Sequence, residues 1–207
     1  ELADVLAQLI AALPQGAPGE TAAHKRYDAA ACAVEIPADV GFCALGHNLY
    51  ALGSSYSGAC PVLSSLVSYG YLWNMVRVQG GAYGTGMNVR RSGDIFCYSY
   101  RDPNLDNTRA VFSAVADFIE DFAAQGMPLD DIIIGAVNTT DPLLDPAGVC
   151  ESQCVRALKG VTPEELAKTR HELLATKPAD LAAMADVLRR YAREGKFCTF
   201  SGTNGGA

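Results

Sequence analysis

The chain has no long hydrophobic run. No stretch approaches the roughly 20 unbroken apolar residues that a membrane-spanning helix needs, and no signal peptide is visible. The sequence also lacks an initiating methionine, because it begins at Glu1 inside a segment with a helical pattern. We therefore expect no membrane partner, and we expect the chain to be a piece of a longer protein.

Basic residues are in deficit. The chain has 16 lysines and arginines against 23 aspartates and glutamates, and its formal net charge is −7. A chain of this sign is repelled by nucleic acid and by anionic membranes unless a local basic patch overrides the mean, so we expect no nucleic-acid partner. Five arginines do cluster in the sequence. They either lie at solvated ends of strands and helices or line a groove for an anionic or carbonyl-rich ligand. The five are Arg77, Arg90, Arg91, Arg101 and Arg109.

Metal ligands are also scarce. The chain has 3 histidines, and none stands in a zinc-binding arrangement. His171 and Glu172 begin like a zinc-binding helix motif, but Ala175 occupies the place of the second histidine, so one helical face offers one ligand. Cys150 and Cys154 are four residues apart, with no second pair nearby to complete a zinc site. We predict no metal site, an exposed His171, and core thiols at 150 and 154.

The 7 cysteines are odd in number and lie mostly inside apolar runs. This pattern indicates buried, reduced thiols and a reducing compartment, which is the cytoplasm or, in a eukaryote, an organelle matrix. At 207 residues and 49% hydrophobic content, the chain can bury a sizeable core.

One stretch, residues 71–84, stands out among the segments that are present. It reads as the end of a helix, the glycine pair Gly80 and Gly81, and then a strand, with Arg77 before the break and Tyr83 after it. Two glycines stop a helix and let another backbone come close. Apolar residues before the break have the spacing of a core-facing helical stripe, namely Val62, Leu66, Tyr69, Trp73 and Val76.

The remaining patterns predict a sheet with helices. Arg90 to Gly93 forms the turn of a hairpin between strands 82–89 and 94–101. Asp102 and Pro103 favour the start of a helix that ends at Gly126. We expect further strands at 32–37, 40–46 and 196–200, and helices at 2–13, 129–139, 148–159, 162–176 and 178–195. The sum is an α+β fold, with helices packed on one face of a largely antiparallel sheet.

Three segments carry a family resemblance. They are Leu72 to Gly84, Arg90 to Gly93, and residues 99–105, with the sequences LWNMVRVQGGAYG, RRSG and SYRDPNL. Together they resemble the last quarter of the presequence protease branch of the pitrilysin/insulinase zinc metalloproteases, without gaps over about thirty residues. The resemblance implies a LuxS/MPP-like metallohydrolase domain. It also implies that residues 1–19 are a helix and linker from the preceding domain, and residues 20–207 the C-terminal domain that binds no zinc.

The resemblance also implies roles for particular residues. In the family, an arginine and a tyrosine at the spacing of Arg77 and Tyr83 reach across a closed chamber to the zinc site of the N-terminal half. The tyrosine hydroxyl holds the scissile carbonyl, and the arginine binds backbone carbonyls of the substrate. Gly80, Gly81 and Ala82 would then line the path of the peptide. Zinc belongs to the parent protein and is bound by an inverted His-x-x-Glu-His motif in another domain.

The implied function is a substrate-binding domain of a zinc endopeptidase that degrades unstructured peptides. Its partners are the peptide and the N-terminal half, and the domain by itself is expected to be inactive. We expect weak self-association, because surfaces that normally meet other domains are exposed.

Other interpretations compete with this function. From residue type alone, Arg77 could cap the helix dipole and Tyr83 could be a half-buried strand aromatic. The whole domain could also be a noncatalytic scaffold of the same superfamily. A nucleotide-binding loop at 81–86 is disfavoured, because the chain passes there from helix to strand, the reverse of the order that points amides at a phosphate.

Overall fold

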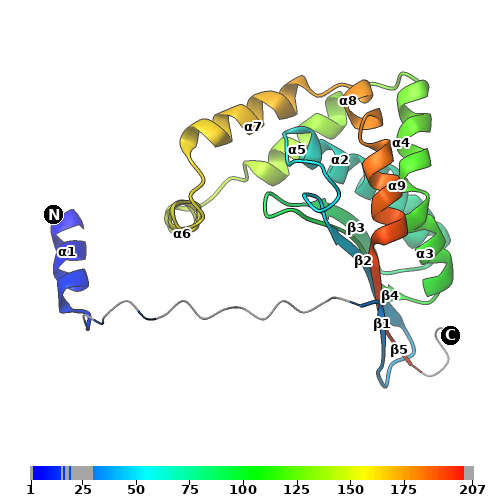
Figure 1. The fold of residues 1–207 in the computed structure, drawn as a ribbon, viewed down its shortest axis with the longest axis horizontal. Coiled ribbons are helices and arrows are strands. Elements are labelled where there is room, and N and C mark those ends of the chain that lie inside the picture. Colours follow the sequence, from blue (N-terminus) through cyan, green and yellow to red (C-terminus); the bar gives the residue numbers. More distant parts are fainter. Residues whose placement is uncertain (1, 15, 17–18, 20–29, 203–207) are drawn as a thin grey trace.

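The computed structural model describes residues 2–14, 16, 19 and 30–202. Helix α1 (Leu2–Ala12) lies apart from the rest (Figure 1), and its residues Val5, Leu6, Leu9 and Ile10 are exposed. The predicted boundary between the linker and the C-terminal domain lies between residues 19 and 20, where a part of the chain that is not described begins. His24 lies within that part.

A 5-stranded sheet forms the centre of the fold, in the order β1-β5-β2-β4-β3. The strands are β1 (Cys32–Glu35), β2 (Gly41–Asn48), β3 (Gly84–Val89), β4 (Asp94–Asp102) and β5 (Lys196–Ser201). Strand β1 pairs with β5 in parallel, and the other pairings are antiparallel, so the sheet is mixed. The α+β class is confirmed, and so is the hairpin: Gly93 has a φ of 95°, and the amide of Arg90 donates to Asp94.

Helices gather on one side of this sheet (Figure 1). They are α2 (Ala59–Ser65), η1 (Leu66–Gln79), α3 (Leu105–Ser113), α4 (Val115–Ala124), α5 (Asp130–Thr140), α6 (Pro146–Leu158), α7 (Pro163–Ala175), α8 (Pro178–Ala182) and α9 (Ala185–Glu194). Helix α7 begins with the capping box that the sequence predicts, in which Thr162 and Glu165 bond each other's backbone amides.

The predicted start of the helix at Asp102 is wrong. Asp102 is the last residue of β4 and is buried, and it accepts hydrogen bonds from the Thr108 hydroxyl at 2.6 Å and the Asn104 amide at 2.8 Å. Asn104 caps α3 instead, because its side chain accepts from the Asn107 amide. The single helix expected up to Gly126 is also divided at Ala114 into α3 and α4.

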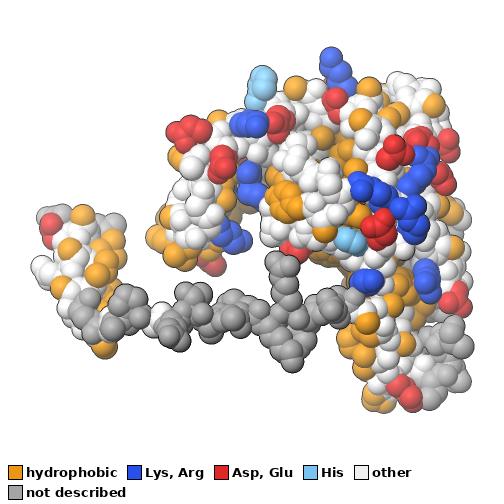
Figure 2. All heavy atoms as spheres, in the orientation of Figure 1, with side chains coloured by type: hydrophobic (Ala, Val, Ile, Leu, Met, Phe, Trp, Pro, Cys, Tyr) orange, Lys and Arg blue, Asp and Glu red, His pale blue; other side chains and the backbone are white. Residues whose placement is uncertain are grey.

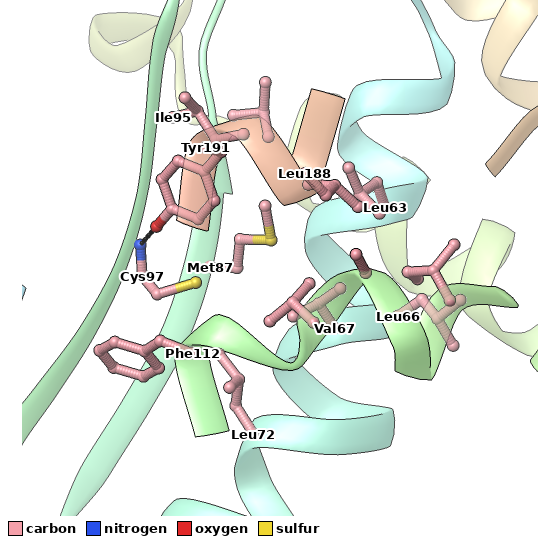
Figure 3. Packing of buried hydrophobic residues seen from close by; sticks show 14 of the residues in the cluster. Leu63, Leu66, Val67, Leu72, Met87, Ile95, Cys97, Phe112, Leu188 and Tyr191 are labelled. Atoms are coloured by element: carbon pink, nitrogen blue, oxygen red, sulfur yellow. Dashed lines mark hydrogen bonds between the residues drawn. The ribbon is translucent and has the colours of Figure 1, made fainter. Parts of the chain in front are cut away.

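The core lies between the sheet and these helices (Figure 3). In β4, Ile95, Cys97 and Ser99 point into it, whereas Tyr98 and Tyr100 point to the other face and are 37% and 45% exposed. Tyr191 of α9 is fully buried. Its hydroxyl accepts from the Cys97 amide at 2.8 Å and donates to the Leu45 carbonyl at 2.7 Å.

The prediction of buried cysteines holds for only part of the set. Cys43, Cys60 and Cys97 are buried, but Cys150 and Cys154 are exposed, so their assignment as core thiols is wrong. Both belong to α6, which has no buried residue. The apolar residues of α6 are not packed against the body of the domain, and its cysteines are therefore open to solvent. Cys32, at the sheet edge, is exposed as well.

The predicted core stripe is also partly wrong. Val62, Leu66 and Val76 are buried, but Tyr69 is 69% exposed and Trp73 is 40% exposed. The reason is that residues 66–79 form a π-helix. A π-helix is wider than an α-helix, with hydrogen bonds from i to i+5. Residues spaced for a 3.6-residue turn therefore rotate away from the core.

Candidate functional site

Arg77 and Tyr83 lie side by side at the surface. The guanidinium carbon of Arg77 is 4.0 Å from the centroid of the Trp73 ring and 5.8 Å from that of the Tyr83 ring. Tyr83 is 64% exposed and Arg77 is partly exposed. Both distances are within the range of cation–π attraction. The structure therefore brings the two predicted residues together and adds Trp73, which the sequence had assigned to the core.

The glycine break has structural causes of its own. A Cβ on Gly80 would lie 2.5 Å from the Val76 carbonyl oxygen, and Gly81 has a φ of 83°. The amides of Gly81, Ala82 and Tyr83 all donate to carbonyls within the domain. Ala82 is buried, with 3% exposure. Hence the amides of these three residues are already hydrogen-bonded within the domain, and the Ala82 side chain does not line a surface.

A bulge in β4 fixes the position of Tyr83. Arg101 has a φ of 51° and lies where the β2–β4 register shifts, so Gly41 pairs with Asp102 and Phe42 with Tyr100. This arrangement lets the Tyr83 amide donate to the carbonyls of both Tyr100, at 3.1 Å, and Arg101, at 3.2 Å. Left-handed backbone is unfavourable for an arginine. No pattern in the sequence predicts this bulge.

The Tyr83 ring continues a row of aromatic side chains on the open face of the sheet. It contacts the Tyr100 ring edge to face, with centroids 5.9 Å apart, and Tyr100 contacts Phe42 in the same way at 5.2 Å. Aromatic pairs favour such edge-on geometry. The row supports the Tyr83 ring from one side, and the residue remains 64% exposed.

A groove of about 470 Å³ begins at Arg77 and Tyr83 and runs along β3. We call it the β3 groove. Its helix wall consists of Ser64, Ser65, Ser68, Tyr69, Trp73 and Arg77, its strand wall consists of residues 83–89, and Tyr56, Pro61, Tyr98, Thr139 and Thr140 complete it. Its course along β3 and its lining of both polar and apolar side chains suit an extended peptide.

The edge of β3 inside this groove is covered by serine hydroxyls. The Met87 amide donates to the Ser68 hydroxyl at 2.9 Å, and the Val89 amide donates to the Ser64 hydroxyl at 3.0 Å. Paired edge amides do not recruit another strand. A peptide lying here would have to displace both serines to bond these two amides, so side-chain contacts must supply most of its binding.

The described part of the chain contains no cluster of three or more His, Cys, Asp or Glu residues that could hold a metal ion. These residues therefore do not fit a zinc site. His171 is exposed, as predicted. Its neighbour Glu172 accepts a hydrogen bond from the Gly58 amide at 2.9 Å, which gives the glutamate a structural role.

Burial makes the inner cysteines unreactive at neutral pH. It raises the pKa of Cys43 to about 11 and that of Cys97 to about 12. Neutral thiols are poor nucleophiles.

Within residues 2–14, 16, 19 and 30–202, no helix combines the length and the apolar content needed to cross a membrane.

Comparison with known proteins gives consistent matches. The model of the PreP C-terminal domain family matches residues 32–200. The chain is 34% identical over 157 residues to presequence protease 1, chloroplastic/mitochondrial, of Arabidopsis thaliana, which covers 75% of this chain and 14% of that protein. It is 32% identical over 160 residues to protein HypA of Clostridium perfringens, covering 77% of this chain and 16% of that protein. The chain thus spans only a small part of the length of these relatives.

A solved structure has the same fold. The peptidase M16 inactive domain from Pseudomonas fluorescens matches with a TM-score of 0.67 and 14% identity, over 100% of this chain and 52% of that one. At this identity the likeness concerns the fold alone.

Proposed function

The chain belongs to the PreP C-terminal domain family, and from this membership we propose that it is the substrate-binding domain of a zinc metalloendopeptidase. In this proposal the domain supplies Arg77 and Tyr83 to an active site whose zinc is held by the N-terminal half of the parent protein. The observation that carries the proposal is the position of the two groups, which are adjacent at one end of the β3 groove, with Tyr83 exposed and Arg77 partly exposed.

Arg77 binds the backbone carbonyls of an unstructured peptide. Its planar guanidinium offers five N–H donors. The Trp73 ring packed 4.0 Å from the guanidinium carbon restricts the side chain before the substrate arrives. A restricted donor loses less conformational freedom when it binds, so the contact favours affinity.

Tyr83 stabilises the scissile carbonyl as negative charge develops on its oxygen. A hydroxyl donor placed at a developing oxyanion stabilises the transition state more than the ground state, and removal of one such donor costs about 2.7–4 kcal/mol. Gly80 and Gly81 keep side chains out of the path of the peptide, and Ala82 contributes only backbone.

The metal and the base come from outside this chain, because its described residues do not fit a zinc site. Peptidases of the M16 family are zinc metalloproteases, and we expect the N-terminal half to be the partner that holds the ion. The domain alone then hydrolyses nothing, and its fold corresponds to the LuxS/MPP-like metallohydrolase type. A reducing cytoplasm, or an organelle matrix as in the relatives named for chloroplast and mitochondrion, is the compartment that we propose.

The test uses the protease that contains this domain. We expect Tyr83→Phe to lower kcat by about 100- to 1,000-fold while the unfolding transition stays in place. Tyr100→Phe is the matched control, because it removes a hydroxyl from the ring that contacts Tyr83. Unchanged turnover in Tyr83→Phe would instead favour the scaffold interpretation.

A second variant separates substrate binding from helix capping. Arg77→Lys keeps a positive charge at the end of η1 but loses the planar fork. We expect unchanged stability and a higher KM. Stoichiometric zinc binding by the isolated chain, or peptidase activity from it, would contradict the proposal.

A further inference from the structure

A second pocket adjoins the far end of the β3 groove. It has a volume of about 360 Å³ and lies between the β3–β4 turn, α5, α6 and α7. Three of its lining residues are Arg91, Arg156 and Arg170, and we call it the arginine pocket. In Figure 2, basic side chains lie at the hollow between α6 and the rest of the domain.

Positive charge in this pocket is not balanced. Asp141 is its one acidic lining residue within the described chain, and it forms an ion pair with Arg170. Arg91 donates to the Thr169 hydroxyl at 2.7 Å and lies 5.2 Å from the centroid of the Tyr56 ring. The side chain of Arg156 makes no hydrogen bond or ion pair with any residue that the structure describes. Among the described residues, two guanidinium groups therefore lack a carboxylate partner, although the net charge of the chain is −7.

The arrangement of Arg91 favours binding over a purely structural role. The Tyr56 ring and the Thr169 hydroxyl hold its guanidinium in place without neutralising it. Arginine forks bind carboxylates through two parallel hydrogen bonds, which are stronger than neutral ones. The pocket thus presents one positioned and one unpaired guanidinium to solvent.

The two hollows adjoin each other. Tyr56 and Thr140 line both the β3 groove and the arginine pocket. Strand β3 separates Tyr83 at one end from the turn that carries Arg91 at the other. A strand rises about 3.4 Å per residue, so the distance along it from Tyr83 to the turn matches about six residues of extended peptide.

We propose that the arginine pocket binds a carboxylate of the peptide in the β3 groove, about six residues from the bond held at Tyr83. The carboxylate is either the C-terminus of the peptide or an Asp or Glu side chain. The identity of this ligand rests on the proposed function, because a peptide is the partner proposed for the adjoining groove.

The test measures binding by the 207-residue chain with calorimetry. Three unstructured peptides of one length are compared: one without acidic residues and with a free C-terminal carboxylate, its C-terminal amide, and the amide with one internal glutamate. Trp73 is the chain's 1 tryptophan and lines the β3 groove, so its fluorescence reports independently whether the groove is occupied.

We expect at least one carboxylate peptide to bind about tenfold more tightly than the plain amide, as charge-assisted hydrogen bonds require. The peptide that gains affinity identifies the source of the carboxylate. In Arg156→Ala the advantage should disappear, and folding should persist because α6 buries no residue. Arg193→Ala is the matched control, since this arginine pairs with Glu194 outside both hollows.

The outcomes separate the two proposals. Equal affinities for all three peptides, with a saturable Trp73 signal, overturn the carboxylate site and leave the proposed function standing. An Arg156-dependent carboxylate preference without any Trp73 signal supports a carboxylate site in the arginine pocket, but contradicts the presence of the peptide in the β3 groove and its binding at Arg77 and Tyr83. Absence of binding to every peptide overturns both.

Discussion

The guanidinium carbon of Arg77 lies 4.0 Å from the centroid of the Trp73 ring, although the sequence pattern assigned Trp73 to the core. The two residues are four apart on the exposed side of the π-helix η1. π-Helical turns are rare and are frequent at functional sites. Here the wider helix turns the Trp73 ring outward, where it packs against Arg77. Within the described chain, Arg77 is the one lysine or arginine that lines the β3 groove.

Removal of the Trp73 ring should weaken peptide binding more than it weakens the fold. We expect Trp73→Ala to lower the affinity of the chain for an unstructured peptide by about threefold to tenfold, because Arg77 loses a cation–π contact. Calorimetry measures the affinity. Trp73→Phe, which retains an aromatic face, should recover part of it, and equal affinity in all three proteins would show that the contact is irrelevant to binding.

Loss of the Tyr191 hydroxyl should destabilise the domain. Tyr191→Phe leaves the buried Cys97 amide without this partner (Figure 3). The Leu45 carbonyl loses the same hydroxyl. We expect the free energy of unfolding to fall by about 1–3 kcal/mol in urea titrations. The exposed Tyr69 supplies the control, since Tyr69→Phe should change stability by less than about 0.5 kcal/mol. A similar small effect at Tyr191 would contradict the assignment.

Stability should decline in alkali partly through the buried thiols. Burial raises the pKa of Cys97 from 9.0 to about 12. Because the folded pKa exceeds the unfolded one, this contribution is complete below pH 9.0 and is lost as pH rises toward about 12. Urea titrations between these pH values should show a shallower decline for Cys97→Ala than for the unaltered chain. Parallel curves would be the contrary result.

The left-handed backbone of Arg101 should respond to residue type. Arg101 has a φ of 51°, a conformation that glycine adopts without a Cβ clash. We expect Arg101→Gly to raise the free energy of unfolding by about 0.5 kcal/mol and the β-branched Arg101→Val to lower it by about 1 kcal/mol or more. Thermal unfolding of both variants would check the order, and a more stable valine variant would refute it.

Local signals in the sequence were accurate where neighbouring residues decide the structure. The capping box of Thr162 and Glu165 and the turn at Gly93 both lie where the pattern placed them. The spacing of Arg77 and Tyr83 around two glycines also predicted that they would be displayed together. Each of these features depends on backbone conformation and hydrogen bonds within a few residues, which the order of residues specifies directly.

Long-range contacts were the source of the errors. The cysteines at 150 and 154 occupy an apolar pattern but are exposed, because α6 buries no residue against the body of the domain. Asp102 has the composition of a helix cap, yet Thr108 and Asn104 use its carboxylate inside the domain. In each case the local pattern indicated one environment, and the packing of distant segments produced another.

By itself, the sequence determined the α+β class, the family resemblance and the pair of groups beside the glycine break. Only the tertiary structure decided that Trp73 faces Arg77, that the serines cover the edge of β3, and that Arg91, Arg156 and Arg170 share one pocket. The physical reason is distance along the chain. A periodic pattern records the neighbours of a residue within one or two turns, whereas a groove is made by segments that meet only after the whole core has packed.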